Sequence, residues 1–310
     1  MTALSVDAGV LTALESRITP TAPLPAELGL RIIGYGEIST VMTVESQPGL
    51  VLKRMAGFLD AQEVHSYQAE VSEYLALLSQ RGITVVPTEV HAVSVEKRHL
   101  AYIVQEQLPV EAIGSHILVH GREEEVAQLI EAILTSLRSA FAKHSPSVLV
   151  GIDAQISNWA QVRTPSGQPE VCYLDVGTPL FRREGRLCRA PELALRSLPR
   201  PLAWFLRKAL FDQVVGRYFD LREVLKDIAA NFIKEGRADR ISVTLTRLNR
   251  FLYEQSGGQA PLTEKEVASY YAEDKQIWAL FQSLRRFDRF LTSKLLRKRY
   301  EYILPGPVKR

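Results

Sequence analysis

Three oxygen-bearing side chains stand at intervals that suit phosphate and metal chemistry. Asp153 precedes Asn158 by five residues, and Asp175 follows Asn158 after two short apolar segments. If residues 159–162 and 171–174 pair as a hairpin, Asn158 and Asp175 face each other, because paired strands lie about 5 Å apart. Mg²⁺ binds through one or two such protein oxygens, with phosphate and water completing its octahedron. We therefore predict a magnesium site at Asn158 and Asp175, with Asp153 placed to reach a hydroxyl beside a transferred phosphate.

A glycine-rich segment and a lysine nearer the N-terminus also suit a phosphate. Residues 32–44 read IIGYGEISTVMTV, in which Gly34 and Gly36 let the backbone turn tightly and approach a ligand closely. A dinucleotide-binding loop would lead into a helix. Here β-branched residues, a Gln-Pro-Gly turn and a second apolar run containing Lys53 follow instead. The sequence therefore predicts strand, loop, strand, turn and strand in that order.

The order of these features resembles that of the protein kinase-like superfamily. A glycine loop, a strand lysine, a helix over 61–80, a strand ending near residue 105, Asp-x4-Asn and Asp-x-Gly follow one another over residues 32–177. The resemblance implies an α+β, bilobal protein kinase-like fold with an antiparallel-sheet N-lobe and a mainly helical C-lobe. Residues 1–28 would form an N-terminal extension, 29–108 the N-lobe, and 109–310 the C-lobe with a basic helical C-terminus.

The same resemblance implies that the cofactors are ATP and Mg²⁺. Protein kinases cover the phosphates with a glycine-rich hairpin and pair the α- and β-phosphates with a lysine on the next strand. Their hinge, between the lobes, hydrogen-bonds the adenine. The residues that match the cofactor-binding positions are Gly34, Gly36, Ser39 (where a third glycine usually stands), Lys53, and the hinge residues Gln105, Glu106, Gln107 and Leu108.

A lysine that is removed from water needs an acidic partner. The helix over 61–80 offers Glu70, which has apolar residues four and seven positions later, and Glu73 as the alternate. We favour Glu70, so the implied catalytic set is Asp153, Lys53 and Glu70.

The catalytic segment departs from that of conventional protein kinases. Gly151-Ile152 stands where they carry His-Arg, and Gln155 stands where they use a lysine that touches the γ-phosphate. The pattern is closer to aminoglycoside, choline and fructosamine kinases, or to uncharacterised bacterial kinase-like proteins. We predict an ATP- and Mg-dependent phosphotransferase whose acceptor is a small molecule rather than a protein. The alternative is a catalytically inactive, kinase-like nucleotide-binding or scaffold protein, and the blandest interpretation makes Asp153 a turn cap and Asn158 a strand end.

Composition excludes several other classes of protein. The chain has 310 residues, of which 46% are hydrophobic and 24% charged, so a disordered chain is excluded. No apolar run approaches the ~20 residues of a membrane span, and the N-terminus lacks the pattern of a signal peptide. The two cysteines, Cys172 and Cys188, cannot make a disulfide framework. A cytoplasmic protein without a transmembrane segment is therefore expected.

Positive charge gathers in the last thirty residues. Residues 281–310 hold nine basic and two acidic side chains, against a net charge of +3 for the whole chain. Such a tail suits a weak contact with an anionic surface. The alternative is a solvated helix face, in which an apolar stripe that includes Leu284, Phe287 and Phe290 lies between the charges.

Overall fold

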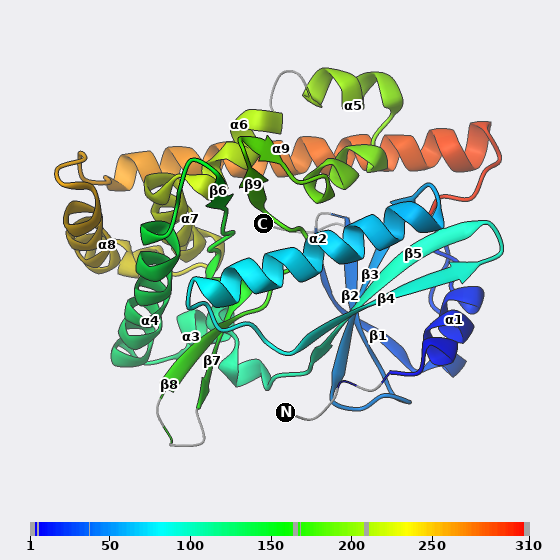
Figure 1. Ribbon diagram of the computed structural model, residues 1–310, viewed down its shortest axis with the longest axis horizontal. Helices are drawn as coiled ribbons and strands as arrows, with labels where there is room; N and C mark the ends of the chain where they lie inside the picture. Colours follow the sequence, from blue (N-terminus) through cyan, green and yellow to red (C-terminus); the bar gives the residue numbers. More distant parts are fainter. Residues whose placement is uncertain are drawn as a thin grey trace.

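A five-stranded antiparallel sheet forms the N-terminal half of the protein (Figure 1). The computed structural model describes residue 4 and residues 6–36, 38–163, 167, 169–207 and 211–306. Glu37 of the expected glycine loop, turn residues 164–166 and 168, and Lys309 and Arg310 of the basic tail lie outside the described residues. The strand order is β1-β2-β3-β5-β4. The strands are β1 (Leu30–Tyr35), β2 (Ser39–Val44), β3 (Leu50–Phe58), β4 (Thr88–Val95) and β5 (Arg98–Glu106).

One helix, α2 (Ala61–Gln80), connects β3 to β4 and covers one face of this sheet. Its N-cap Asp60 accepts a hydrogen bond from the Glu63 N–H, which satisfies one of the free amides of the first turn. Its buried side chains recur at intervals of three and four, and they are Val64, Tyr67, Val71, Tyr74, Leu77 and Leu78. The expected helix is therefore confirmed, with its apolar face directed at the core.

A second helix, α1 (Ala8–Arg17), packs against the sheet's other face. Leu11 and Ile18 from this segment share a buried cluster with Met42 of β2 and Leu52 of β3. We therefore propose that the N-lobe begins at α1 rather than at residue 29.

The C-terminal half is mainly helical. Helices α4, α7, α8 and α9 pack together, and α9 is the longest of them; a short hairpin of β7 and β8 projects beside α3 and α4 (Figure 1). The helices are α3 (Gly114–His120), α4 (Glu123–Ala142), α5 (Arg200–Leu206), α6 (Asp212–Gly216), α7 (Leu221–Lys234), α8 (Ile241–Ser256) and α9 (Glu264–Phe290). The strands are β6 (Val148–Val150), β7 (Trp159–Arg163), β8 (Pro169–Tyr173), β9 (Phe181–Arg183) and β10 (Arg186–Leu187).

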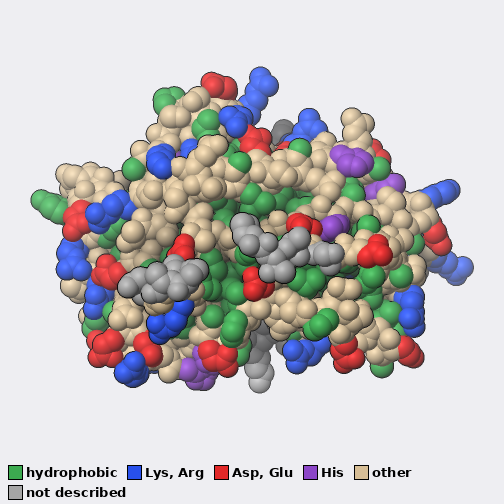
Figure 2. All heavy atoms as spheres, turned by 60° about the horizontal axis from the view of Figure 1, so that its bottom comes forward, with side chains coloured by type: hydrophobic (Ala, Val, Ile, Leu, Met, Phe, Trp, Pro, Cys, Tyr) green, Lys and Arg blue, Asp and Glu red, His purple; other side chains and the backbone are tan. Residues whose placement is uncertain are grey.

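The expected α+β architecture with two lobes is confirmed. One large apolar core runs through both halves, since α2 of the N-lobe shares it with α4 and α7 of the C-lobe. On the face shown in Figure 2, hydrophobic side chains lie in the central hollow, and most charged side chains lie towards the periphery. None of the described helices is both long enough and apolar enough to cross a membrane.

Candidate functional site

The hairpin of β7 and β8 has the expected register. Trp159 pairs with Tyr173 and Ala160 with Cys172, so residues 158 and 175 flank the open end of the ribbon. The Leu174 N–H donates to the Asn158 carbonyl oxygen at 2.9 Å, which extends the pairing by one step. The Asn158 and Asp175 side chains line the same cavity.

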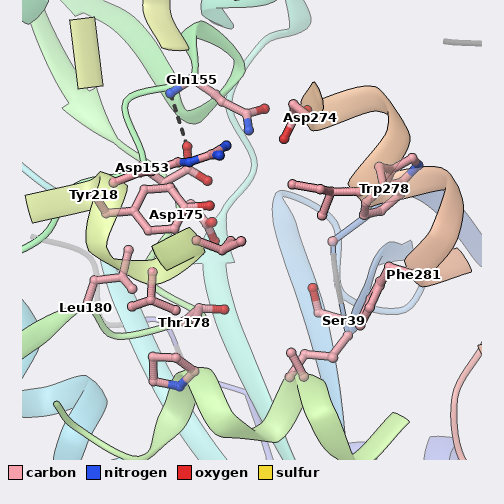
Figure 3. Close-up of a pocket in the computed structure, with 18 of the residues that line it drawn as sticks. Ser39, Asp153, Gln155, Asp175, Thr178, Leu180, Tyr218, Asp274, Trp278 and Phe281 are labelled. Carbon is pink, nitrogen blue, oxygen red and sulfur yellow. Dashed lines mark hydrogen bonds between the residues drawn. The ribbon is translucent and has the colours of Figure 1, made fainter. Parts of the chain in front are cut away.

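Asp153 is held in a tight turn immediately before this hairpin. The Gln155 N–H donates to Asp153 Oδ1 at 3.2 Å, and Asn158 Nδ2 donates to the Asp153 carbonyl oxygen at 3.2 Å. Because the Asn158 nitrogen is used in this way, the amide oxygen is the atom that can act as a metal ligand. Figure 3 shows the Asp153 and Asp175 side chains directed into one cavity. The three oxygen-bearing side chains predicted to act together therefore lie together.

Lys53 reaches this group from β3. Its Nζ donates to the Leu174 carbonyl oxygen at 2.8 Å and lies 3.6 Å from Asp175 Oδ1. The Lys53 side chain is 12% exposed, so its charge is compensated mainly by Asp175. Lys53 of β3 and Asp175 of the C-terminal part thus pair where the two lobes meet, beside the cavity.

The expected pairing of Lys53 with Glu70 is wrong in this structure, and so is the alternate with Glu73. The Glu70 carboxylate accepts hydrogen bonds from the N–H groups of Arg189 (2.9 Å) and Ala190 (2.8 Å). These amides stand at the start of the 3-10 helix Ala190–Ser197, where N–H groups have no partner within the helix and attract anions. Glu73 pairs with Arg183.

The rotation of α2 is fixed by two tyrosines rather than by Glu70. The Tyr67 hydroxyl donates to the Gly177 carbonyl oxygen at 2.7 Å, and the Tyr74 hydroxyl donates to that of Gly151 at 2.9 Å. Burial raises the pKa of both phenols well above the usual value, so both remain donors. These bonds connect α2 directly to the segments that carry Asp153 and Asp175.

The glycine loop forms part of the same cavity. Tyr35, Gly36 and Ser39 line it, and the Gly36 N–H donates to the Ser39 carbonyl oxygen at 3.1 Å. A Cβ on Gly36 would lie 2.4 Å from Ser39 Oγ, so a larger residue here would force the Ser39 hydroxyl to rotate away. Gly34 lies two residues before Gly36, in β1, where the pairing with β2 has an irregularity.

The expected hinge residues are bound to neighbouring parts of the protein. Buried Gln105 donates through Nε2 to Thr88 Oγ1 (3.1 Å) and to the Leu174 carbonyl oxygen (3.0 Å). The Gln107 N–H donates to the Gly49 carbonyl oxygen at 2.7 Å. The Gln107 amide is therefore not available to hydrogen-bond adenine in this arrangement. Glu106 is exposed and pairs with Leu50, and its contact with adenine stays a prediction.

A cavity of about 340 Å³ contains the candidate residues, and it extends well beyond them. One end carries Asp153, Asn158 and Asp175, and the remainder lies between the 3-10 helix, α6 and α9. In Figure 3, Trp278 and Phe281 of α9 face the cavity from the side opposite Asp153 and Asp175. This size is within the usual range of small-molecule pockets.

Comparison with known proteins places the chain in a family. The model of a family of unknown function, DUF6206, matches residues 30–289. The chain belongs to this family. The match runs from β1 almost to the end of α9, so it includes every candidate residue described above. Among curated proteins, no sequence matches this member of the family.

Two solved structures are among those to which this chain is similar. WaaP in complex with acyl carrier protein has 13% sequence identity and a TM-score of 0.35, and the match covers 86% of this chain and 91% of that one. Rad53 1–466 in complex with AMP-PNP has 10% identity and a TM-score of 0.37, with 78% of this chain and 60% of that one covered.

Sequence reasoning missed a basic side chain beside the segment that carries Asp153 and Gln155. Lys234, at the end of α7, lines the cavity, and its Nζ donates to Gln155 Oε1 at 2.7 Å. Arg217 also lines the cavity, where it pairs with Glu273. The one signal in the sequence was Gln155, since a neutral side chain at that position leaves room for a cation from elsewhere.

A buried carboxyl group lies close to these cations. The pKa of Asp227 is raised to about 7, mainly by burial and also by the nearby charge of Asp274, against the opposing effects of Lys234, a hydrogen bond with Tyr270, and Arg217. Asp274 itself lines the cavity. Asp227 is therefore a buried carboxyl group near the cavity whose pKa lies close to neutral pH.

The basic C-terminal segment is only partly a charged surface. Arg285 is 1% exposed, so it belongs to the core. The apolar stripe between the charges is open to solvent at Phe287 (50% exposed) and Phe290 (54% exposed). Contact between residues 281–310 and an anionic surface stays a prediction.

Proposed function

We propose that this protein is an ATP- and Mg-dependent phosphotransferase that acts on a small molecule. The observation that carries the proposal is the convergence of Asp153, Asn158 and Asp175 in one cavity, which the glycine loop covers from the other lobe. Lys53 adds a positive charge 3.6 Å from Asp175. Phosphoryl transfer depends mainly on positioning and electrostatics, and this arrangement supplies both.

Each residue has a definite task in this proposal. The acceptor hydroxyl gives its proton to Asp153 while its oxygen forms a bond to the γ-phosphorus. The bond from that phosphorus to the β,γ-bridging oxygen breaks, which leaves a phosphate monoester and ADP. Lys53 orients the α- and β-phosphates. Asn158 and Asp175 would hold Mg²⁺, which, when bound, neutralises phosphate charge.

The second candidate is a nucleotide-binding protein without catalysis. Its support is the absence of the usual catalytic-loop lysine and the engagement of the Gln107 amide within the protein. Under either proposal the reduced cysteines, Cys172 and Cys188, which are buried and unpaired, suit the predicted cytoplasmic location.

Nucleotide binding is tested by thermal shift. With ATP and Mg²⁺ at about 100 times the dissociation constant, the protein should gain about 2.7 kcal/mol, which corresponds to about 5 °C. Chelation of Mg²⁺ or the substitution Lys53→Met should remove most of this shift. Lack of any shift in the unmodified protein would contradict both candidates, whereas a shift without phosphotransfer to any acceptor would favour the second.

Lys234 is proposed to supply the cation that Gln155 does not. Lys234→Ala should lower kcat by about 10²-fold, as expected for loss of one electrostatic donor, with a smaller change in the KM for ATP. Lys234→Arg should retain more activity than the alanine variant. Lys226→Ala is the matched control on the same helix, since Lys226 pairs with Glu223. An equal loss of activity in the control would show that the effect comes from α7 as a whole.

A further inference from the structure

The cavity changes character with distance from the carboxylates. At one end stand the polar groups already described, with Thr178 and Asp274 nearby. Every described lining residue that comes from residues 191–206 and 277–284 is apolar. The side chains that form most of this apolar wall are Leu195, Leu198, Trp278, Phe281 and Leu284.

The wall limits the class of molecule that fits. A sugar or aminocyclitol carries polar groups along its whole length, and each one buried without a partner is penalised. A molecule with one polar end and an apolar remainder meets complementary surroundings along the whole cavity. In Figure 3 the carboxylates of Asp153 and Asp175 lie at one side of this space, and Trp278 and Phe281 lie across it.

We propose that the acceptor is an alcohol with a hydrocarbon tail, and this rests on the phosphotransferase function proposed above. The hydroxyl lies at Asp153, and the tail lies along the apolar wall between the 3-10 helix and α9. The wall comes from segments far apart in the sequence, so it requires the complete C-lobe. The product is an alkyl phosphate monoester together with ADP.

The first test measures phosphotransfer from ATP to linear primary alcohols from butan-1-ol to decan-1-ol. Each methylene that enters the wall should raise kcat/KM by about threefold to fourfold until the cavity is full. Glycerol, which has the hydroxyls but no tail, should be a poor acceptor. Efficient phosphorylation of glycerol, or rates that do not depend on chain length, would overturn the inference and leave the phosphotransferase function intact.

The second test measures binding of the tail without turnover. We expect 12-bromododecan-1-ol to quench tryptophan fluorescence saturably in a Trp204→Phe protein, since Trp278 lies in the wall. Trp159 is fully buried in the core, and Trp204 is 62% exposed and would add an unspecific signal. Adding Trp278→Phe should abolish the saturable quenching. Quenching that persists would overturn the assignment of the wall.

A matched pair of leucine substitutions compares the wall with an exposed leucine just beyond the end of α9. Leu284→Gln should weaken binding of 12-bromododecan-1-ol by about tenfold. Leu295→Gln, at a side chain 64% exposed beyond the end of α9, should leave it unchanged. Equal weakening by both would overturn the inference. Saturable quenching at Trp278 in a protein that shows no ATP-induced thermal shift would instead support the apolar site and contradict the phosphotransferase.

Discussion

Asp175→Asn should reduce phosphotransfer by about 10³-fold or more, while the protein stays folded. The substitution keeps the size of the side chain but removes the negative charge beside Lys53 Nζ and the proposed magnesium. A lost electrostatic group typically costs 10²–10³ in rate, and here one charge serves both the metal and the lysine. The measurement is kcat with γ-labelled ATP and the best alcohol acceptor.

The control for this substitution is Glu124→Gln, which removes one negative charge from an exposed position on α4. It should have full activity. The phosphotransfer activity of Asp153→Asn should lie between those of Asp175→Asn and Glu124→Gln. Loss of a general base typically lowers the rate by 10²–10⁴-fold and leaves the nucleotide site intact. Full activity in Asp175→Asn would refute the proposed site, since every role in it is defined relative to that carboxylate.

Local spacing was sufficient to predict the carboxylate end of the site. Asn158 and Asp175 are joined by a two-stranded ribbon, and the geometry of paired strands fixes where the two ends of such a ribbon lie. Asp153 is only five residues away and is tied to Asn158 by a side-chain hydrogen bond. The alternation of short apolar runs and turns likewise predicted the N-lobe sheet and its single helix.

Features that depend on distant segments could not be predicted in this way. Glu70 lies on the expected helix, but its partner is set by where the amides at 189 and 190 arrive, about 120 positions later. Lys234 reaches Gln155 across 79 positions, and no spacing rule links them. The apolar wall likewise depends on distant segments, because it forms only where α9 lies opposite the 3-10 helix.

The N-terminal helix shows how strongly a distant contact can determine the fold. Glu15 of α1 is fully buried, and its carboxylate accepts hydrogen bonds from Arg54 of β3, Arg98 of β5 and the Tyr102 hydroxyl. Arg54 also donates to the Glu301 carbonyl oxygen at 2.7 Å, so the C-terminal segment joins the same network. Arg54 lies one position after Lys53, and this network therefore stabilises the strand that carries the lysine proposed to orient the phosphates.

Glu15→Met should cost about 3–5 kcal/mol in the free energy of unfolding, because the variant leaves the Arg54 guanidinium buried beside an apolar side chain. The measurement is urea or thermal denaturation followed by circular dichroism. Glu27→Gln, at an exposed position before β1, should change stability by less than about 0.5 kcal/mol. A small effect of Glu15→Met would mean that α1 does not hold β3 in place.

The double variant Glu15→Met/Arg54→Met distinguishes two causes of instability: a buried Arg54 guanidinium without its partner, and the loss of the Glu15–Arg54 interaction itself. Replacing both ends of a buried ion pair by apolar side chains is often nearly neutral, so the double variant should recover more than half of the loss.

Burial opposes ionisation of Glu15, but hydrogen bonds and charges from Arg54, Tyr102 and Arg98 outweigh it and lower its pKa below the usual 4.5. The ionised Glu15 carboxylate therefore contributes fully to the free energy of unfolding above about pH 5, and this contribution decreases as pH falls through the lowered pKa. The stability difference between the unmodified protein and Glu15→Met should shrink in acid, and a difference that stays constant would contradict the ionised network.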